Sequence, residues 1–445
     1  MLYPTPSRDE LVARFRGAHL ASLPTPSAVL DRSVVARNCT RLAAALAGVR
    51  LRPHTKTHKT LEVTRLQLAG LGHGDVIVST VREAEALEPL VHAGVVSGIL
   101  YGMPLAPSAV PRLAALRARH HPALDLSVVL DHPDQLAALA STAGGAWSVF
   151  VKIDAGYRRA GLETASPELA ALLAAIAAPG THTRLRGFYA HAGHSYASTS
   201  AACARAFLAD EIAAVFAAAD ALSRPPDGLI LSVGATPTVL AAAAATPAAT
   251  DTAATDAAAA TAADDDDGDD GRLVRDAALT AQQRGWTLEL HAGVYALMDL
   301  QQLATAPAGG LGWRDMALTV LAEVVSVYPA RREALVALGS TGLGREPGRI
   351  AGWGVVAAWR PGLPWDGAQK SGWRVDRISQ EHGVLTHDDD GGGGDGGGGP
   401  IELHVGMKLR VWPQHACIAG HAHGWYFVVD GDDCVVDIWV RCRGW

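Results

Sequence analysis

Residues able to supply amine and imidazole chemistry cluster around Lys56. Residues 52–59 read Arg-Pro-His-Thr-Lys-Thr-His-Lys, at the end of a short segment with the composition of a buried strand. A lysine at the end of such a strand is partly desolvated, which lowers its pKa and makes its amine available as a nucleophile. A lone lysine is more often an exposed surface side chain. The interpretation of Lys56 therefore depends on the other clusters in the chain.

Four more clusters of polar and small residues each follow a β-prone segment. They read Asp-Ala-Gly-Tyr-Arg-Arg-Ala-Gly at 154–161, Tyr-Ala-His-Ala-Gly-His-Ser-Tyr at 189–196, Ser-Val-Gly-Ala-Thr-Pro-Thr at 232–238 and His-Ala-Gly-Val-Tyr at 291–295. In a barrel of parallel strands, functional side chains gather where the strands end. The recurrence of such clusters at strand ends favours a functional role for Lys56.

The last two clusters have the composition of a phosphate-binding corner. Glycine lets a ligand approach backbone N–H groups closely, and a hydroxyl adds a further donor. The residues that fit this role are Gly234, Thr236, Gly293 and Val294. An ordinary turn between a strand and a helix has a similar composition, so the pattern alone is weak. A reactive lysine opposite a phosphate corner indicates pyridoxal phosphate, a cofactor that acts as an electron sink.

A different kind of site is indicated by Pro-Gln-His-Ala-Cys at 413–417. Alternate residues of an extended strand face the same way, so His415 and Cys417 are expected to bind one metal ion through imidazole and thiolate. Two protein ligands leave positions open for water or a substrate oxygen. Taken in isolation, the motif is better explained as a buried, uncoordinated pair. Rival ligands elsewhere are His421, His423, Cys434 and Cys442.

The elements that must position these residues follow a repeating pattern between residues 25 and 310. Short β-prone runs alternate with Ala- and Leu-rich helical stretches such as 168–177 and 202–221, which is typical of βα units around a parallel sheet. The eight runs are 51–56, 76–80, 97–101, 126–130, 148–154, 185–190, 229–233 and 287–291. Eight strands in this length predict a TIM (β/α)8 barrel, an α/β fold.

Residues 311–445 have a different sequence pattern, with Val-, Trp- and Ile-rich runs and Gly-rich turns. This pattern predicts a mainly β domain after the barrel. We expect residues 1–24 to pack against this domain. Two low-complexity segments interrupt the pattern, the Ala-, Thr- and Asp-rich 241–271 and the Gly- and Asp-rich 388–399. Neither can bury enough apolar surface to order itself, so both are expected to be disordered surface insertions.

The composition excludes several classes of protein. Twelve aspartates lie in the two low-complexity segments, and without them the formal charge of −7 becomes mildly positive. The chain has no cluster of Lys and Arg interleaved with aromatic residues, so nucleic-acid binding has no support. It also lacks a signal-peptide pattern and any apolar run of about 18 residues that could span a membrane. Five scattered cysteines argue against a disulfide framework. We therefore expect a cytoplasmic protein.

Taken together, the motifs resemble the eukaryotic-type D-serine dehydratase family, which is related to the D-threonine aldolases and more distantly to alanine racemase. The resemblance rests on residues 53–59, 187–196, 232–238, 380–383 (Gln-Glu-His-Gly) and 415–417 (His-Ala-Cys). It covers nearly the whole chain outside the two insertions. The combination of motifs is far more specific than any one of them.

The resemblance implies a cofactor site. Lys56 would bind pyridoxal phosphate covalently and remove the α-proton of the substrate. Arg159 would contact the phenolic oxygen of the cofactor, and His191 would lie against its pyridine ring, beside Tyr189. The phosphate would be held by one loop with Ser232, Gly234 and Thr236 and a second loop with Gly293, Val294 and Tyr295. Val294 stands where the family has Asn.

The resemblance also implies a metal site and a reaction. His415 and Cys417 would bind zinc, which would coordinate the substrate hydroxyl and make it a better leaving group; Gln414 stands where Asn usually precedes the metal histidine. The expected reaction converts D-serine to pyruvate and ammonia, with D-threonine as the other candidate substrate. A homodimer is implied, in which the β-domain of one subunit helps to cover the barrel mouth of the other.

Two other functions compete with this interpretation. A D-threonine aldolase also uses pyridoxal phosphate and a metal but cleaves the Cα–Cβ bond. The resemblance suggests that aldolases carry a carboxylate where this chain has Cys417, which favours the dehydratase. A non-catalytic carrier of pyridoxal phosphate would need neither a metal site nor a second domain. The β-domain with His415 and Cys417 argues against it.

Overall fold

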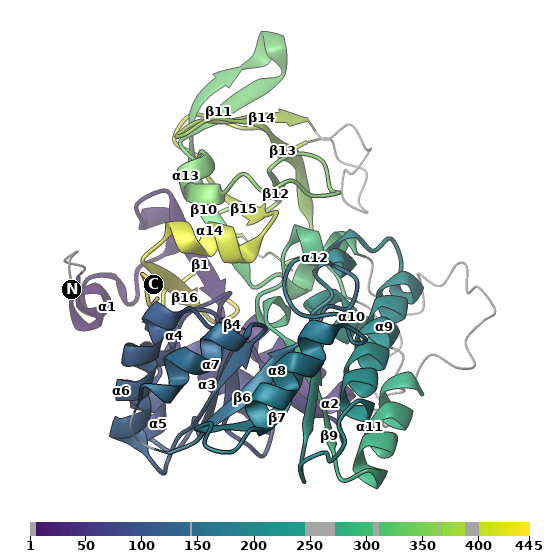
Figure 1. Ribbon diagram of the computed structural model, residues 1–445. Helices are drawn as coiled ribbons and strands as arrows, with labels where there is room; N and C mark the ends of the chain where they lie inside the picture. The colour runs from purple at the N-terminus through teal and green to yellow at the C-terminus, as the bar shows by residue number, and fades with distance from the viewer. Residues whose placement is uncertain are drawn as a thin grey trace.

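The computed structural model describes residues 6–142, 145–244, 272–305, 311–363, 365, 367–387 and 400–445. Figure 1 shows two bodies, a barrel surrounded by helices and a mainly β body stacked on one end of it. Within the described residues, no helix has the length and apolar character needed to cross a membrane. The two bodies meet at residues 57 and 58, which contact Cys417 and Arg441.

The barrel consists of eight parallel strands, as predicted. They are β2 (Arg50–Pro53), β3 (Asp75–Val78), β4 (Gly98–Pro104), β5 (Asp125–Leu130), β6 (Trp147–Lys152), β7 (Thr183–Tyr189), β8 (Ile230–Val233) and β9 (Thr287–Ala292). The strand order is β2-β9-β8-β7-β6-β5-β4-β3. The open edges are joined by a parallel bridge between His54 and Ile77, and the N–H of Thr55 donates to Ile77 O at 3.0 Å. This contact nearly closes the barrel at the point where Lys56 follows.

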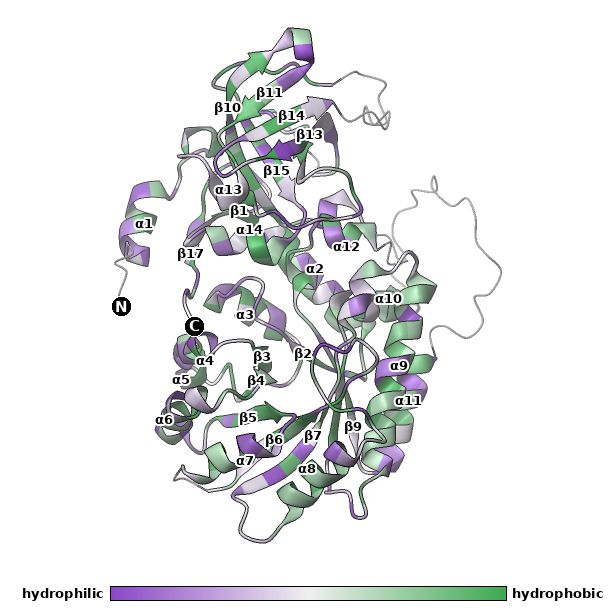
Figure 2. Ribbon diagram, turned by 45° about the horizontal axis from the view of Figure 1, so that its top comes forward, coloured by the Kyte–Doolittle hydropathy of each residue, from purple (hydrophilic) through white to green (hydrophobic). Residues whose placement is uncertain are grey.

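Alternate residues of these strands point into the barrel and against the surrounding helices. One buried cluster takes a single residue from each of six neighbouring strands, namely Ile77, Leu100, Val129, Phe150, Tyr189 and Ile230. Figure 2 shows hydrophobic residues along barrel strands such as β5, whereas α1 (Arg8–Phe15) carries a mixture of hydrophobic and hydrophilic residues. The barrel interior is therefore a packed core that supports the residues at its mouth.

The helices of the barrel follow the strands in sequence. They are α2 (Arg32–Ala45), α3 (Leu61–Leu68), α4 (Val81–Ala86), α5 (Glu88–His92), α6 (Val110–His120), α7 (Pro133–Ala140), α8 (Pro167–Ala177), α9 (Ala201–Asp220), α10 (Thr236–Ala244), α11 (Leu273–Gln283) and α12 (Leu300–Ala304). Side chains at several starts accept a backbone N–H, as Thr60 does from Val63 and Ser200 from Cys203. The predicted helices 168–177 and 202–221 correspond to α8 and α9.

The mainly β body is built on a nine-stranded sheet. Its strands are β1 (Ser27–Asp31), β10 (Leu318–Tyr328), β11 (Glu333–Val336), β12 (Gly354–Ala357), β13 (Lys370–Ile378), β14 (Gly383–His387), β15 (Lys408–Pro413), β16 (Trp425–Val429) and β17 (Asp437–Val440). Their order is β11-β14-β13-β12-β15-β10-β1-β16-β17, and β11 also pairs with β10. Two short helices, α13 (Ser340–Leu343) and α14 (Ala416–Ala422), complete the body.

The N-terminal segment differs from the predicted division at residue 25. Strand β1 pairs antiparallel with β10 and parallel with β16, so residues 27–31 belong to the nine-stranded sheet and not to the barrel. We therefore place the start of the barrel after Asp31, whose side chain caps α2. Helix α1 lies against β17, where Arg8 Nη2 donates to Asp437 Oδ1 at 2.6 Å.

The predicted insertions lie largely outside the described residues. Residues 388–399 lie wholly outside, as do residues 245–271. The first four residues of the predicted 241–271 segment instead form the end of α10, and Ala241 is fully buried. The prediction was wrong for these four residues because their alanines pack against α9, where α10 and α9 share a small apolar cluster with Ala201 and Ala204.

Candidate active site

A cavity of about 410 Å³ opens at the C-terminal ends of the barrel strands. It is lined by residues at the ends of β4, β6, β7 and β9 and in the loops after β2, β6, β7, β8 and β9, including His54, Lys56, Met103, Lys152, Arg159, Tyr189, His191, Tyr196, Gly234, Thr236, His291 and Gly293. Most of the predicted cofactor residues therefore lie around one space. Ser232, Val294 and Tyr295 are buried behind its wall.

Lys56 is held in a tight loop directly after β2. Its backbone N–H donates to His54 Nδ1 at 3.3 Å, while the neighbouring Thr55 donates its hydroxyl to Glu83 Oε2 at 3.2 Å. Lys59 Nζ lies 2.9 Å from the other oxygen of Glu83. Burial lowers the pKa of Lys56; Cys417 opposes this shift and Arg159 adds to it. The loop thus presents an amine that gives up its proton more readily than an exposed lysine.

The predicted phosphate corner is assembled around Thr236, at the start of α10. Thr236 Oγ1 accepts the N–H groups of Gly293 at 3.3 Å and Val294 at 3.2 Å. Gly234 has a φ of +135°, and a Cβ there would lie 2.6 Å from His291 O, so only glycine fits. Because Val294 contributes only its backbone while its side chain is buried, the departure from Asn leaves its N–H bond to Thr236 unchanged.

Ser232 does not face this corner. Its hydroxyl donates to Glu289 Oε1 at 3.0 Å and lies 3.1 Å from His291 Nδ1. Glu289 is fully buried and also pairs with Arg52, whose Nε lies 2.8 Å from the same oxygen. Since the hydroxyl proton goes to the carboxylate, Ser232 accepts from His291 Nδ1. Nε2 of His291 is then an acceptor, and it is buried with no partner among the described residues.

The aromatic and imidazole rings form one wall of the cavity. Tyr189 and His291 stack with their centroids 4.3 Å apart and their planes 8° from parallel. His191 Nδ1 donates to Gly234 O at 2.7 Å, which fixes the ring of His191 beside the phosphate corner. Burial lowers the pKa of both histidines well below the usual range, and nearby cationic side chains lower it further. Both rings are therefore neutral at physiological pH.

Lys152 and Glu211 are buried charged residues that the sequence interpretation missed. Lys152 Nζ lies 4.6 Å from the Tyr189 ring centroid, and burial lowers its pKa to about 7. Glu211 accepts the N–H groups of Ala192 at 2.5 Å and Gly234 at 3.2 Å, and burial raises its pKa to about 7. Lys152 lies near the end of the predicted strand 148–154 and ends the observed strand β6, so its position was a usable signal. Glu211 lies in the middle of α9, and its position in the sequence gave no signal of a role in the site.

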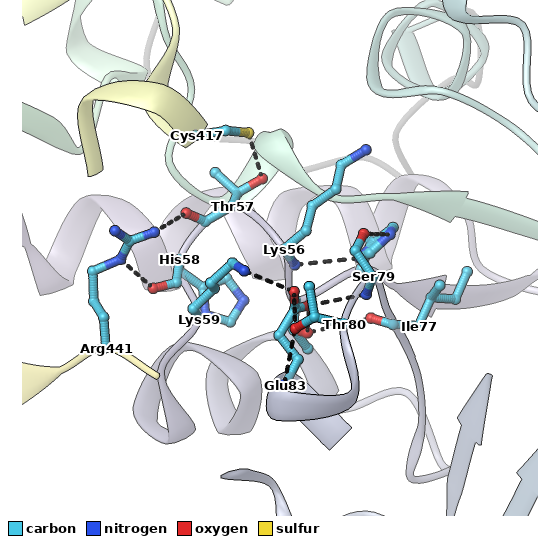
Figure 3. Close-up of polar contacts among 12 residues, drawn as sticks. Lys56, Thr57, His58, Lys59, Ile77, Ser79, Thr80, Glu83, Cys417 and Arg441 are labelled. Carbon is cyan, nitrogen blue, oxygen red and sulfur yellow. Dashed lines mark hydrogen bonds and ion pairs between the residues drawn. The ribbon is translucent and has the colours of Figure 1, made fainter. Parts of the chain in front are cut away.

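His415 and Cys417 are brought together beside Lys56, but not on a strand. Strand β15 ends at Pro413, His415 is the residue before α14, and Cys417 lies in the first turn of that helix. The strand prediction was wrong because Ala416 starts the helix, where its N–H is accepted by Asp299 Oδ2 at 2.8 Å. Cys417 Sγ lies 3.2 Å from Thr57 Oγ1, and Figure 3 shows the Lys56 side chain extending toward the same side of the loop.

The His415 and Cys417 pair has the chemistry of a metal site. Burial opposes ionisation of the Cys417 thiol, but its interactions with His415 and Lys56 outweigh burial and lower its pKa. Burial lowers the pKa of His415, whereas Cys417 and Asp299 raise it, with a net rise to about 9. Nδ1 of His415 is buried without a hydrogen-bond partner among the described residues. Once the imidazole proton is released, the pair offers a thiolate and a neutral imidazole nitrogen, which are ligands that zinc takes in proteins.

The rest of this region limits how a metal would be held. The described residues contain no group of three or more His, Cys, Asp and Glu side chains that could hold a metal ion, so the rival ligands form no such site there. His423, one of the rivals, has its Nε2 2.9 Å from Gly342 O. Gln414 Nε2 donates to the carbonyls of Ile350 and Gly352, both at 2.7 Å. Gln414, which stands where the family has Asn, therefore anchors the segment before His415.

Several features of the cavity fit pyridoxal phosphate. The glycines at 234 and 293 beside Thr236 let a phosphate approach the backbone closely, and Lys56 supplies an amine of lowered pKa. The buried acceptor of His291 lacks a partner among the described residues, as expected where a ligand completes the wall. Three basic side chains, Lys56, Lys152 and Arg159, line the space and favour an anion.

Comparisons with known proteins agree with this geometry. Residues 30–252 match the alanine racemase N-terminal domain family, and residues 317–429 match the family described as "Putative serine dehydratase domain". The D-serine dehydratase of Schizosaccharomyces pombe is 35% identical over 100% of this chain and 97% of its own length. That of Saccharomyces cerevisiae is 32% identical over 98% of this chain and 100% of its own length.

A solved structure has the same fold over nearly the whole chain. The D-threo-3-hydroxyaspartate dehydratase from Delftia sp. HT23 is 29% identical and covers 96% of this chain and 100% of its own, with a TM-score of 0.73. A D-threonine aldolase from Arthrobacter sp. is more distant, at 28% identity over 96% of this chain and 95% of its own length. The chain is thus a member of the D-serine dehydratase family, a group of lyases with the alanine racemase-like fold for which pyridoxal phosphate is the implied cofactor.

Proposed function

We propose that the chain converts D-serine to pyruvate and ammonia, with pyridoxal phosphate held on Lys56 and a zinc ion held by His415 and Cys417. The observation that carries this proposal is the 3.2 Å contact between Thr57 Oγ1 and Cys417 Sγ. It brings the metal-binding pair of the β body next to the residue that follows Lys56. An amine with a Lewis-acid site beside it is what elimination of a β-hydroxyl requires.

The two bound groups divide the chemistry. Pyridoxal phosphate supplies an electron sink for the charge that develops at Cα, and zinc supplies a Lewis acid for the departing hydroxyl. Nζ of Lys56 would take the α-proton, and burial favours this role because it lowers the pKa of the amine. His415 and Cys417 would hold the metal, and Figure 3 shows Cys417 on the side of the loop toward which Lys56 extends. The β-hydroxyl leaves as water.

The remaining residues bind and orient. We assign the phosphate to the corner formed by Gly234, Thr236 and Gly293, where the N–H groups of Gly293 and Val294 fix Thr236 by donating to its hydroxyl oxygen. The neutral ring of His191, fixed by Gly234 O, would pack against the pyridine ring, and Tyr189 supports that wall by stacking on His291. Arg159 at the mouth would contact the phenolic oxygen of the cofactor. Tyr295 and Ser232 would support the corner from behind.

Assembly and location are also part of the proposal. Met103, Tyr157 and Ile418 are 50%, 39% and 39% exposed, and Met103 lines the cavity. Large apolar residues exposed at a cavity mouth favour a covering partner, which supports a homodimer in which the β body of one subunit covers the other. All five cysteines are unpaired, which agrees with a reducing compartment such as the cytoplasm.

Product analysis tests the proposal. The purified chain, loaded with pyridoxal phosphate, is incubated with D-serine, then with a chelator, and finally with added Zn²⁺. We expect pyruvate and ammonia to form in equal amounts, to stop on chelation and to resume with Zn²⁺. Turnover that is indifferent to the chelator would remove the metal from the mechanism.

The same assay separates the competing functions. D-threonine is supplied in parallel, because an aldolase would release glycine and acetaldehyde from it and no pyruvate from D-serine. The lower identity to the D-threonine aldolase favours the dehydratase. A carrier that merely binds the cofactor would turn over neither substrate. Family membership among lyases argues against that alternative.

A further inference from the structure

The segment after β17 carries a buried guanidinium that the proposed reaction does not use. Arg441 is only 4% exposed. Its Nε donates to His58 O at 3.0 Å, its Nη2 donates to Thr57 O at 3.2 Å, and its Nη1 donates to Gly420 O. Figure 3 shows Arg441 approaching the carbonyls of the loop that contains Lys56. Arg441 thus contacts both the loop that carries Lys56 and the segment that carries Cys417.

The two contacted segments are those that carry the reacting groups. Thr57 and His58 directly follow Lys56 in the chain, and Gly420 lies in α14, the helix whose first turn contains Cys417. The backbone continues this association, since the N–H of Cys442 donates to Lys59 O at 2.8 Å. The tail therefore runs alongside the Lys56 loop.

Close packing supports a specific fit of this side chain. A Cβ on Gly420 would lie 2.6 Å from Tyr426 Oη and 3.4 Å from Arg441 Cζ, so glycine lets the guanidinium lie against α14. On another side, Arg441 Cζ lies 5.4 Å from the centroid of the Tyr426 ring. The side chain is enclosed by the elements that it joins.

Stability alone is a poor explanation for this arrangement. Each hydrogen bond of the Arg441 side chain among the described residues goes to a carbonyl oxygen. Burying a cation costs desolvation energy, and an apolar side chain of similar volume is often as stabilising in such a place. What a guanidinium adds is a planar fork of donors with fixed directions. It can therefore fix three carbonyls relative to one another.

We propose that Arg441 is a positioning residue that sets the place of Cys417 relative to Lys56. The proposal rests on the proposed function, because it assigns these two residues to one reaction. Arg441 anchors the C-terminal part of α14 to the backbone of residues 57–58, while the contact between Cys417 and Thr57 anchors its first turn. The Lys56 loop is held separately by the bond from Thr55 to Ile77. Losing Arg441 should therefore disturb the metal ligands more than the lysine.

The test compares metal binding with cofactor binding in the full-length holoenzyme. Zn²⁺ affinity is measured by competition with a chromophoric chelator, and bound cofactor by its visible absorbance. For Arg441→Ala we expect Zn²⁺ affinity to fall by about 10- to 100-fold, as for other residues that orient metal ligands. The cofactor absorbance should stay unchanged, and kcat for D-serine should fall with little change in KM. Arg443→Ala, an exposed arginine of the same tail, should change none of these.

Two further measurements address a variant that folds poorly. Guanidinium ion added to Arg441→Ala should occupy the vacated volume and restore Zn²⁺ affinity. Arg441→Lys keeps the charge and much of the volume, but an ammonium group does not reproduce the fork of donors. This variant should keep its melting temperature and cofactor absorbance and still bind Zn²⁺ more weakly than the parent.

The outcomes are distinguishable from failure of the proposed function. If the parent protein binds Zn²⁺ and the Arg441 variants bind it equally tightly, the role of Arg441 is overturned. The proposed function is then unaffected. Parallel loss of Zn²⁺, cofactor and melting temperature, without rescue, would reduce Arg441 to a structural residue and overturn it as well. A parent protein that binds no Zn²⁺ would overturn the proposed function and this inference together.

Discussion

Thr57 Oγ1 lies 3.2 Å from Cys417 Sγ, across 360 residues of sequence. The hydroxyl favours the ionised form of the thiol, because a hydrogen bond to the thiolate lowers the pKa of Cys417. The contact also joins the barrel loop to α14. The hydroxyl of Thr57 therefore acts on Cys417, a proposed metal ligand. The backbone of Thr57 belongs to the loop that carries Lys56.

Replacing Thr57 by valine removes this hydroxyl with little change in volume. A hydrogen bond of this kind contributes about 0.5–1.5 kcal/mol, so we expect Zn²⁺ affinity to fall about 2- to 10-fold. The cofactor absorbance should not change. Thr280→Val, on the exposed face of α11, is the matched control. An unchanged Zn²⁺ affinity in Thr57→Val would show that the contact has no role in metal binding.

Replacing Lys56 by alanine should abolish both cofactor attachment and turnover. The amine is the attachment point and the base, so activity should fall by at least about 10³-fold. Loss of the visible absorbance of the bound cofactor and loss of pyruvate production are the measurements. Lys408→Ala, a lysine of the β body paired with Glu323, should keep both. Turnover retained by Lys56→Ala would remove this lysine from its role.

Replacing Cys417 by alanine should separate the two bound groups. The variant loses one of two metal ligands, so it should bind pyridoxal phosphate normally, lose Zn²⁺ and lose more than about 100-fold in activity. Metal analysis and absorbance on the same sample measure this. Cys434→Ala is the control, because Cys434 is exposed and unpaired. If Cys417→Ala kept full zinc content and activity, the metal would have to lie elsewhere.

Replacing Gly234 by alanine tests the phosphate corner. The backbone there has a φ of +135°, and the new Cβ would lie 2.6 Å from His291 O, so the loop must move. We expect weaker affinity for pyridoxal phosphate, measured by titrating the cofactor into the cofactor-free protein. Gly228→Ala also has a positive φ, of +68°, but no atom within 4 Å of its Cβ, and serves as the control for backbone strain alone. Equal affinities in the two variants would argue against a phosphate at this corner.

His58 should make the free energy of unfolding depend on pH. Its Nε2 lies 2.9 Å from Gln67 Oε1, and burial lowers its pKa from 6.5 to about 3. The unfolded chain therefore binds this proton more readily than the folded chain. The contribution is complete above about pH 6.5 and is lost as the pH falls toward 3, by up to about 1.4 kcal/mol per pH unit. Urea midpoints at pH 7.5 and 5.5 should shift less in His58→Gln than in the parent. Equal shifts would contradict the assignment.

The sequence predicts those parts of the site that depend on local pattern. Each β-prone run in the barrel region became a strand, because alternation of strand and helix is encoded within about 30 residues. Lys56 and the two glycine corners could be found because they follow such runs directly. His415 and Cys417 could be found as a pair. The helix that begins at Ala416 could not be predicted, because it depends on Asp299 from a distant loop.

Other residues of the site could not be predicted in this way. Glu211 lies inside a helix whose sequence gives no reason to expect a buried carboxylate, and its role depends on where Ala192 and Gly234 end up. Arg441 contacts residues 57 and 58 from the far end of the chain. Such contacts are set by the stacking of the two bodies. No periodicity in the sequence encodes that arrangement.

The position of β1 has a consequence for synthesis of the protein. This N-terminal strand lies between β10 and β16 in the sheet, with Val29 beside Phe427. Because domains tend to fold as they leave the ribosome, the barrel segment can fold while β1 still waits for a partner made hundreds of residues later. The sheet, and α14 with it, can be completed only after residues 408–429 have been made. A nascent chain would therefore carry the lysine long before it could carry the metal site.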